Sequence, residues 1–149
     1  MKLEAEIVKG KFQNEYHKAV VNIVFTYNWL VEEQLKQLKP YDISLQQYNI
    51  LRILRGQHPK PASVKLIKAR MLDKMPDVSR LVEKLRVKGL VDRFICPEDR
   101  RHVDVNITEK GLELLTKLDP KEKEIEKFLS NLNEQEIEHL NFYLDKLRG

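Results

Sequence analysis

Residues that build catalytic and metal sites are scarce in this sequence. Cys96 is the one cysteine among 149 residues, which excludes an intrachain disulfide and fits a reducing compartment. The four histidines stand apart, and without HExxH or CxxC spacing we expect no structural metal. The five glycines form neither a phosphate-binding loop nor a nucleophile elbow. We therefore expect no enzyme and no bound cofactor.

Long hydrophobic runs are also missing. A stripe of apolar residues from Tyr16 to Leu38 has the period of a helix over roughly six turns, but Asn22 and Asn28 interrupt it. Its uninterrupted runs are far too short to cross a bilayer. The first residues include acidic side chains and no apolar core, so we expect no signal peptide. The sequence therefore predicts a cytoplasmic protein without a membrane partner. The long apolar face between Tyr16 and Leu38 predicts a protein partner that covers it.

Positive charge is concentrated in the middle of the chain, although the net charge is only +4. Residues 60–103 carry 12 basic and 6 acidic side chains, whereas residues 104–149 carry 7 and 11. Phosphate binding needs such local charge, since affinity for DNA comes largely from counterion release by Lys and Arg. A solvated surface could have the same composition, so charge alone leaves both interpretations open.

A charged hairpin is predicted between residues 90 and 107. Polar and apolar side chains alternate from His102 to Ile107, which is the pattern of a strand with one buried face. Residues 90–96 are rich in strand-forming types, and residues 97–99 are turn formers. Thr108 predicts an N-cap, followed by a helix with an acidic first turn. The tip of the hairpin then carries Arg100 and Arg101.

Two short helices are predicted before this hairpin. The first covers residues 64–71, with Ser63 as its N-cap. The second begins at Pro76, whose missing N–H costs nothing at the first helical position, and ends at Gly89, the usual left-handed cap residue. Its apolar stripe consists of Val78, Leu81, Val82 and Leu85. Two short helices, a tight link and a hairpin make a winged helix-turn-helix module.

Helices are predicted on both sides of this module. Residues 44–47 have a capping-box pattern before an apolar stripe that lasts until Gly56. After the hairpin, Asp119 and Pro120 look like the cap and first position of a restarted helix, and residues 133–136 form a second capping-box pattern. The terminal helices have long apolar seams that suggest dimerisation, although they could instead fold back on their own domain.

The chain resembles the MarR (multiple antibiotic resistance regulator) family of bacterial transcription factors. The resemblance rests on VSRLVEKLRVKGLVDR (residues 78–93) and EDRRHVDVNITEKG (residues 98–111), which are similar to the family's recognition helix, wing and following helix start in order and spacing. Two segments depart from the family pattern. One is KLIKARM (residues 65–71), and the other is the turn LDKMPD (residues 72–77), where the family more often has small hydroxyl residues. Base contacts therefore cannot be transferred to this turn.

The resemblance implies a mainly α fold with a small β-hairpin wing, in a single domain of residues 1–149. Residues 44–108 would form the winged helix module, and residues 10–40 and 109–147 the dimerisation helices. The implied function is a homodimeric, sequence-specific regulator that binds a pseudo-palindromic operator in double-stranded DNA. Such a protein would act as a repressor that a small-molecule effector releases.

The resemblance also places the DNA contacts. The recognition helix would enter the major groove, and the wing would approach the adjacent minor groove. The residues expected to face the DNA are Ser79, Arg80, Lys84, Arg100 and Arg101. Asp99, two residues before Arg101, would orient the guanidinium.

Two alternatives stay open. Tyr16, Tyr27 and Tyr48 could line an effector crevice, as the resemblance implies, or they could pack in the core. The module could also be a protein–protein adaptor without DNA contact. Two adjacent arginines at the wing tip favour DNA, because an adaptor would more often show an apolar patch there.

Overall fold

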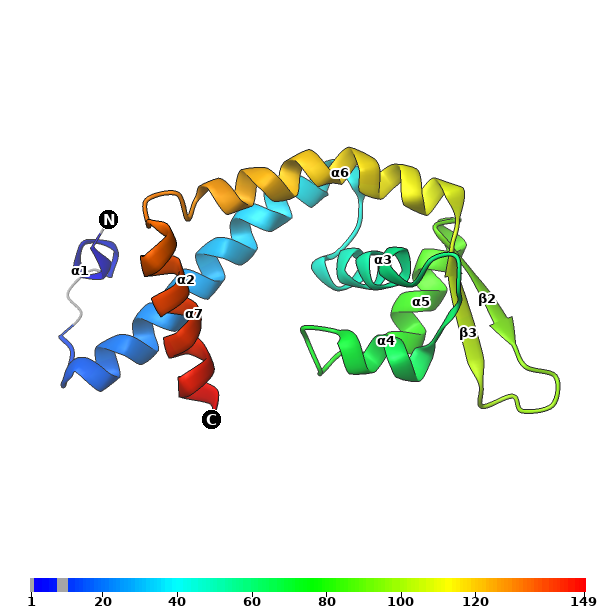
Figure 1. Ribbon diagram of the computed structural model, residues 1–149, viewed down its shortest axis with the longest axis horizontal. Coiled ribbons are helices and arrows are strands. Elements are labelled where there is room, and N and C mark those ends of the chain that lie inside the picture. The colour runs from blue at the N-terminus through cyan, green and yellow to red at the C-terminus, as the bar shows by residue number, and fades with distance from the viewer. Residues whose placement is uncertain (1, 8–10) are drawn as a thin grey trace. The chain divides into compact units, whose positions relative to one another are not determined.

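The computed structural model describes residues 2–7 and 11–149. It contains two compact units, Met1–Lys36 and Gln37–Gly149. The larger unit holds the hairpin and the helices around it (Figure 1). Within the described ranges, no helix has both the length and the apolar character that a membrane span requires.

The first unit contains α1 (Leu3–Glu6) and most of α2 (Glu15–Leu38). The long helix predicted from the apolar stripe is confirmed, with 24 residues. Residue 10, where the predicted N-terminal dimerisation segment begins, lies outside the described residues. Much of the apolar stripe of α2 is exposed. The helix α1 was not predicted, because four residues are too few to show a helical period. Apart from the buried Leu3, its residues are exposed.

The second unit is a winged helix module with flanking helices, so the predicted fold class is confirmed. Its elements are η1 (Lys39–Tyr41), α3 (Leu45–Gln57), β1 (Ala62–Ser63), α4 (Val64–Arg70), α5 (Val78–Val87), β2 (Val91–Ile95), β3 (Val103–Ile107), α6 (Glu109–Lys127) and α7 (Glu134–Arg148). The helices α3, α4 and α5 gather beside the hairpin of β2 and β3, and α6 follows the hairpin (Figure 1).

Side-chain caps fix the helix starts. The N-caps predicted for α3, α4, α6 and α7 are confirmed as Ser44, Ser63, Thr108 and Asn133, each of which accepts the backbone N–H three residues later. The predicted start of α5 at Pro76 is wrong. Asp77 is the N-cap, because its carboxylate accepts the backbone N–H of Arg80 at 3.2 Å, and the helix begins at Val78. A carboxylate satisfies a free donor at the helix start, which a proline ring cannot do.

The sheet has the order β1–β3–β2, and both strand pairs are antiparallel. In the hairpin, Val91 of β2 pairs with Ile107 of β3. The predicted end of β3 at Ile107 is confirmed, although the strand begins at Val103 and does not include His102, and β2 is one residue shorter at each end than predicted. Strand β1 was not predicted, because two residues are too few to show alternation. It extends the sheet by pairing Ala62 with Val105.

The core of the second unit lies between the helices and the sheet. Its largest fully buried side chains are Ile50, Leu51, Leu54, Ile67, Met71, Val82, Leu85, Val91, Val105, Leu115 and Leu118. At Gly111, the first turn of α6 passes very close to the base of the hairpin. A Cβ atom added to Gly111 would lie 2.4 Å from the carbonyl oxygen of Leu90 and 2.6 Å from Cγ1 of Ile107. Gly111 is therefore required by close approach rather than by backbone conformation.

The helix α6 is continuous, so the predicted restart at Asp119 and Pro120 is wrong. The carboxylate of Asp119 does not cap a helix; it accepts hydrogen bonds from Nη1 of Arg55 on α3, at 2.9 and 3.0 Å. One turn later, Nη1 of Arg52 lies 2.5 Å from Oε1 of Glu122. These two ion pairs bind α6 to α3 on both sides of Pro120, and the proline lies inside the helix at the cost of one backbone hydrogen bond.

Candidate nucleic-acid interface

Helix α5 presents a fixed face to solvent. Its apolar stripe faces the core, with Val82 and Leu85 both 0% exposed and Leu81 partly buried. Because burial fixes the rotation of the helix, the opposite side must face outward. The predicted contact residues Ser79, Arg80 and Lys84 are all exposed on that side. Their contact with DNA stays a prediction.

Glu83 of α5 binds two arginines. Its carboxylate accepts hydrogen bonds from Nε and Nη2 of Arg86 at 2.9 and 2.8 Å, and it lies 3.1 Å from Nη1 of Arg93 on β2. The hydrogen bonds from Arg86 hold the pKa of the Glu83 carboxyl below its usual range. Two basic residues of the positively charged segment are thus engaged within the protein, and the pair with Arg93 connects α5 to the hairpin.

The link between α4 and α5 exposes two large apolar side chains. Leu72 is 89% exposed and Met75 is 91% exposed. The backbone of the link is nevertheless held in place. The N–H of Leu72 donates to Oδ1 of Asn49 at 3.0 Å, and the N–H of Met75 donates to Oδ1 of Asp73 at 3.0 Å. The ammonium group of Lys74 donates to the last turn of α4 at 2.6 Å.

Sequence reasoning missed these two side chains. The segment is too short to have a period, and the family's hydroxyl pattern is absent from it. One feature of the sequence does indicate them: Leu72 and Met75 stand in a link where polar turn formers are expected.

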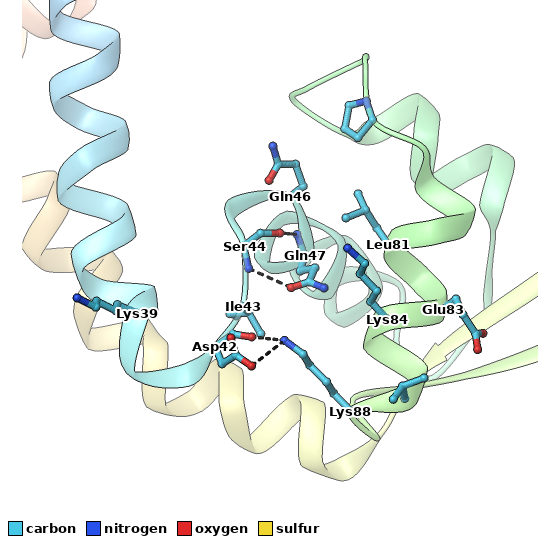
Figure 2. Close-up of a pocket in the computed structure, with 12 residues that line it drawn as sticks. Lys39, Asp42, Ile43, Ser44, Gln46, Gln47, Leu81, Glu83, Lys84 and Lys88 are labelled. Atoms are coloured by element: carbon cyan, nitrogen blue, oxygen red, sulfur yellow. Dashed lines mark hydrogen bonds and ion pairs between the residues drawn. The ribbon is translucent and has the colours of Figure 1, made fainter.

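A groove separates the start of α3 from α5 (Figure 2). Ser44 and Gln46 line it from α3, and Lys84 lines it from α5. At its other end, the ammonium group of Lys88 donates to the carbonyl oxygen of Asp42 and lies 3.5 Å from the carboxylate of the same residue (Figure 2). The positive end of the α3 dipole and the Lys84 charge both face this groove, and the carboxylates of Asp42 and Glu83 also line it.

Side-chain and backbone hydrogen bonds fold the wing tip. The backbone N–H of Arg101 donates to Oδ1 of Asp99 at 3.0 Å, and the N–H of His102 donates to the carbonyl oxygen of Asp99 at 2.9 Å. The N–H of Cys96 then closes the turn on the carbonyl oxygen of His102 at 3.1 Å. Arg100 and Arg101 are exposed at the tip, as predicted. Asp99 therefore orders the backbone of Arg101, and its predicted ion pair with the guanidinium stays a prediction.

The tyrosines expected at an effector crevice have different surroundings. Tyr16 and Tyr27 on α2 are 87% and 64% exposed. Tyr48 on α3 is partly buried, and the guanidinium carbon of Arg52 lies 5.8 Å from its ring centre. Burial raises the pKa of the Tyr48 hydroxyl. Core packing is thus excluded for the two tyrosines of α2 in the single chain, and an effector role for all three stays a prediction.

Comparisons with known proteins agree on one family. The model of the MarR family matches residues 43–103. The crystal structure of a MarR transcription factor from Planctomyces limnophilus is 32% identical in sequence, and the match covers 91% of this chain and 98% of that one, with a TM-score of 0.70. The HTH-type transcriptional repressor IacR of Pseudomonas putida is 26% identical over 129 residues, which are 81% of this chain and 76% of that protein.

A more distant structure has the same fold. BpsR of Bordetella bronchiseptica is 20% identical, and the match covers 89% of this chain and 99% of that one, with a TM-score of 0.75. That structure concerns the regulation of BpsR DNA binding by 6-hydroxynicotinic acid.

Proposed function

The chain belongs to the MarR family of transcriptional regulators, and we propose that it acts as a homodimer that binds double-stranded DNA in a sequence-specific manner. It is a regulator and not an enzyme. One observation carries the proposal: a core-anchored helix, α5, directs Ser79, Arg80 and Lys84 outward beside a hairpin whose tip exposes Arg100 and Arg101.

The shape and charge of these two elements support the two modes of contact. An α-helix fits the major groove, where base edges can be distinguished, so α5 reads the sequence. The narrow minor groove has enhanced negative potential, which favours a guanidinium such as that of Arg101. The groove lined by Ser44 and Lys84 would receive a backbone phosphate at the edge of this contact.

Exposed apolar side chains support the homodimer. In the single chain these side chains lie on α2, on α7 and between α6 and α7. Monomeric proteins rarely expose so many large apolar side chains. The main ones are Tyr16, Val20, Val24, Tyr27, Leu129, Leu132, Leu140, Phe142, Tyr143 and Leu147. A second copy of the chain would cover them. A dimer with twofold symmetry would read a pseudo-palindromic operator, because each subunit meets one half-site.

Regulation by a small molecule is the finer part of the proposal. The protein would be a cytoplasmic repressor that its effector releases, with Tyr16, Tyr27 and Tyr48 at the effector site. IacR, which is similar in sequence, is a transcriptional repressor, and BpsR has the same fold and a DNA binding that 6-hydroxynicotinic acid regulates. An effector should lower DNA affinity by the same factor by which DNA lowers effector affinity, since coupling between two binding sites is reciprocal.

The proposal is tested by selecting duplexes from a randomised pool with the full-length protein. The expected result is an enriched consensus with two inverted half-sites, bound more tightly than a shuffled duplex of the same composition. Failure to enrich any sequence would contradict the proposed function and favour the adaptor alternative.

A further inference from the structure

The link between α4 and α5 combines a fixed backbone with exposed apolar side chains. A single exposed Leu or Met is common on protein surfaces and needs no explanation by itself. Here the two side chains are 89% and 91% exposed, and they project from the link of residues 71–77. Two backbone N–H groups of this link are bonded to Asn49 of α3 and to Asp73 within the link, and the side chain of Lys74 binds the last turn of α4. Leu72 and Met75 are therefore displayed at a defined place rather than on a loose loop.

That place is the N-terminal end of α5. Met75 lies two residues before the N-cap Asp77, and Leu72 directly follows Met71, which is 1% exposed and anchored in the core. In a helix-turn-helix, the N-terminal residues of the recognition helix are the ones that contact base edges. Arg80, in the first turn of α5, is exposed next to the link.

The charges around the link match nucleic acid. Lys68, Arg70, Lys74 and Arg80 lie within eight residues of the apolar pair in sequence and are exposed, although Arg70 also donates to Gln57 and Lys74 to the end of α4. The nearby carboxylates of Asp73 and Asp77 accept backbone N–H groups. Basic residues beside the link would hold phosphates, while the apolar side chains would face the bases. In the major groove, the one apolar group on a base edge is the C5 methyl of thymine.

We propose that Met75 and Leu72 are specificity-determining residues that recognise thymine methyl groups in the major groove. This inference rests on the proposed function, in which α5 reads DNA. The unbranched thioether side chain of Met75 can adapt to the position of a methyl group, and contact between two apolar groups removes both from water.

Replacement of thymine by uracil tests the inference, because it removes the methyl group and leaves every hydrogen-bonding group of the base pair in place. The probe is the duplex selected by the wild-type protein, compared with copies in which each thymine in turn is uracil. Wild-type affinity should fall about fourfold for each methyl group that is contacted, as expected for burial of one methyl-sized group.

Two substitutions complete the test. Met75→Ala should weaken binding to the thymine duplex and abolish the response to uracil at one position in each half-site, because the two changes remove the same contact. Val87→Ala is the matched control, since Val87 is 72% exposed at the other end of α5. It should retain the full response to uracil. Thermal melting confirms that both variants are folded.

The outcomes separate this inference from the proposed function. If the wild-type protein selects a consensus but binds its thymine and uracil duplexes equally, the inference is overturned and the proposed function stands. If Met75→Ala keeps the wild-type response to uracil at every position, the assignment to Met75 is overturned. If no consensus is selected, the proposed function itself has failed.

Discussion

The arginines of the positively charged segment are of two kinds: some form ion pairs within the protein, and others are exposed at the wing tip. Glu83 binds Arg86 and Arg93, so these two guanidinium groups have a partner within the protein. Arg100 and Arg101 at the wing tip are exposed, and the hydrogen bonds there involve backbone groups. The composition of residues 60–103 does not show which arginines form ion pairs within the protein, whereas the contacts in the structure do.

Arg101→Ala should weaken operator binding at least about tenfold, since the loss of one such contact costs about 1–3 kcal/mol. The free energy of unfolding should change by less than about 0.5 kcal/mol, because the side chain is exposed. Asp99→Ala should act in the same direction but more weakly, because it loosens the backbone of the tip and leaves the guanidinium in place. DNA binding at one salt concentration and thermal melting measure both effects. Unchanged DNA affinity of Arg101→Ala would show that the hairpin is not a DNA-contacting wing.

Gly111→Ala should destabilise the protein by about 2–3 kcal/mol, because its Cβ would overlap the carbonyl oxygen of Leu90, a backbone atom that cannot move aside cheaply. Gly56→Ala is the control. Gly56 lies in α3 with nothing within 4 Å of an added Cβ, so this change should stabilise the protein by about 0.5–1 kcal/mol. Denaturant unfolding measures both. Equal effects of the two substitutions would contradict the close approach at Gly111.

Among the secondary-structure elements, α6 shows how tertiary contacts override a local pattern. The pair Asp119 and Pro120 has the chemistry of a cap followed by a first helical residue. Arg55 of α3 instead binds the carboxylate of Asp119, and Arg52 binds Glu122 one turn later. These two contacts lie on either side of Pro120, and the helix continues through the proline.

Pro120→Ala should raise the free energy of unfolding by about 1–3 kcal/mol, since alanine restores the missing N–H donor inside α6. Asp119→Ala should lower it by at most about 1 kcal/mol, because the ion pair with Arg55 is partly exposed. Denaturant unfolding again gives both values. If α6 were broken at this point, Pro120→Ala would be close to neutral and loss of the Asp119 cap would be the larger effect.

On the scale of the whole molecule, the chain exposes apolar surface on its terminal helices and positive charge on the winged helix module. None of the residues of α7 is buried. The core of the second unit reaches back to Leu38, which is 3% exposed. The two surfaces suit different partners, a second copy of the chain and DNA.

Removal of residues 1–36 should abolish the dimer, because it deletes most of the exposed apolar stripe of α2 but keeps Leu38 for the core. Sedimentation at micromolar concentration should show a dimer for the intact chain and a monomer for the truncated one. Circular dichroism of the truncated chain checks that its remaining helices are formed. A folded monomer of the intact chain under these conditions would contradict the homodimer.

DNA binding should depend strongly on salt. If the dimer neutralises roughly eight phosphates, log K should fall with log salt at a slope near −7. Arg101→Ala should make this slope shallower by about one unit for each phosphate contact that is lost. A slope close to zero for the wild-type protein would favour an adaptor that binds protein.

The sequence by itself determined most of the local structure. It predicted the N-caps Ser44, Ser63, Thr108 and Asn133, the strand β3 with its end at Ile107, and the apolar stripe of α5, because each depends on hydrogen bonds or periodicity within a few residues. The exposure of Ser79, Arg80, Lys84, Arg100 and Arg101 followed from the same patterns. The resemblance to one family supplied the functional interpretation.

Tertiary structure alone decided the features that depend on residues far apart in the chain. Continuity of α6 comes from arginines 64 or more positions earlier, the glycine at position 111 is required by the approach of the hairpin, and β1 exists through its pairing with β3. The exposed pair Leu72 and Met75 is fixed by Asn49 of α3 and by the end of α4. A pattern within a few residues cannot predict these features, because the interactions that stabilise them are between residues that only folding brings together.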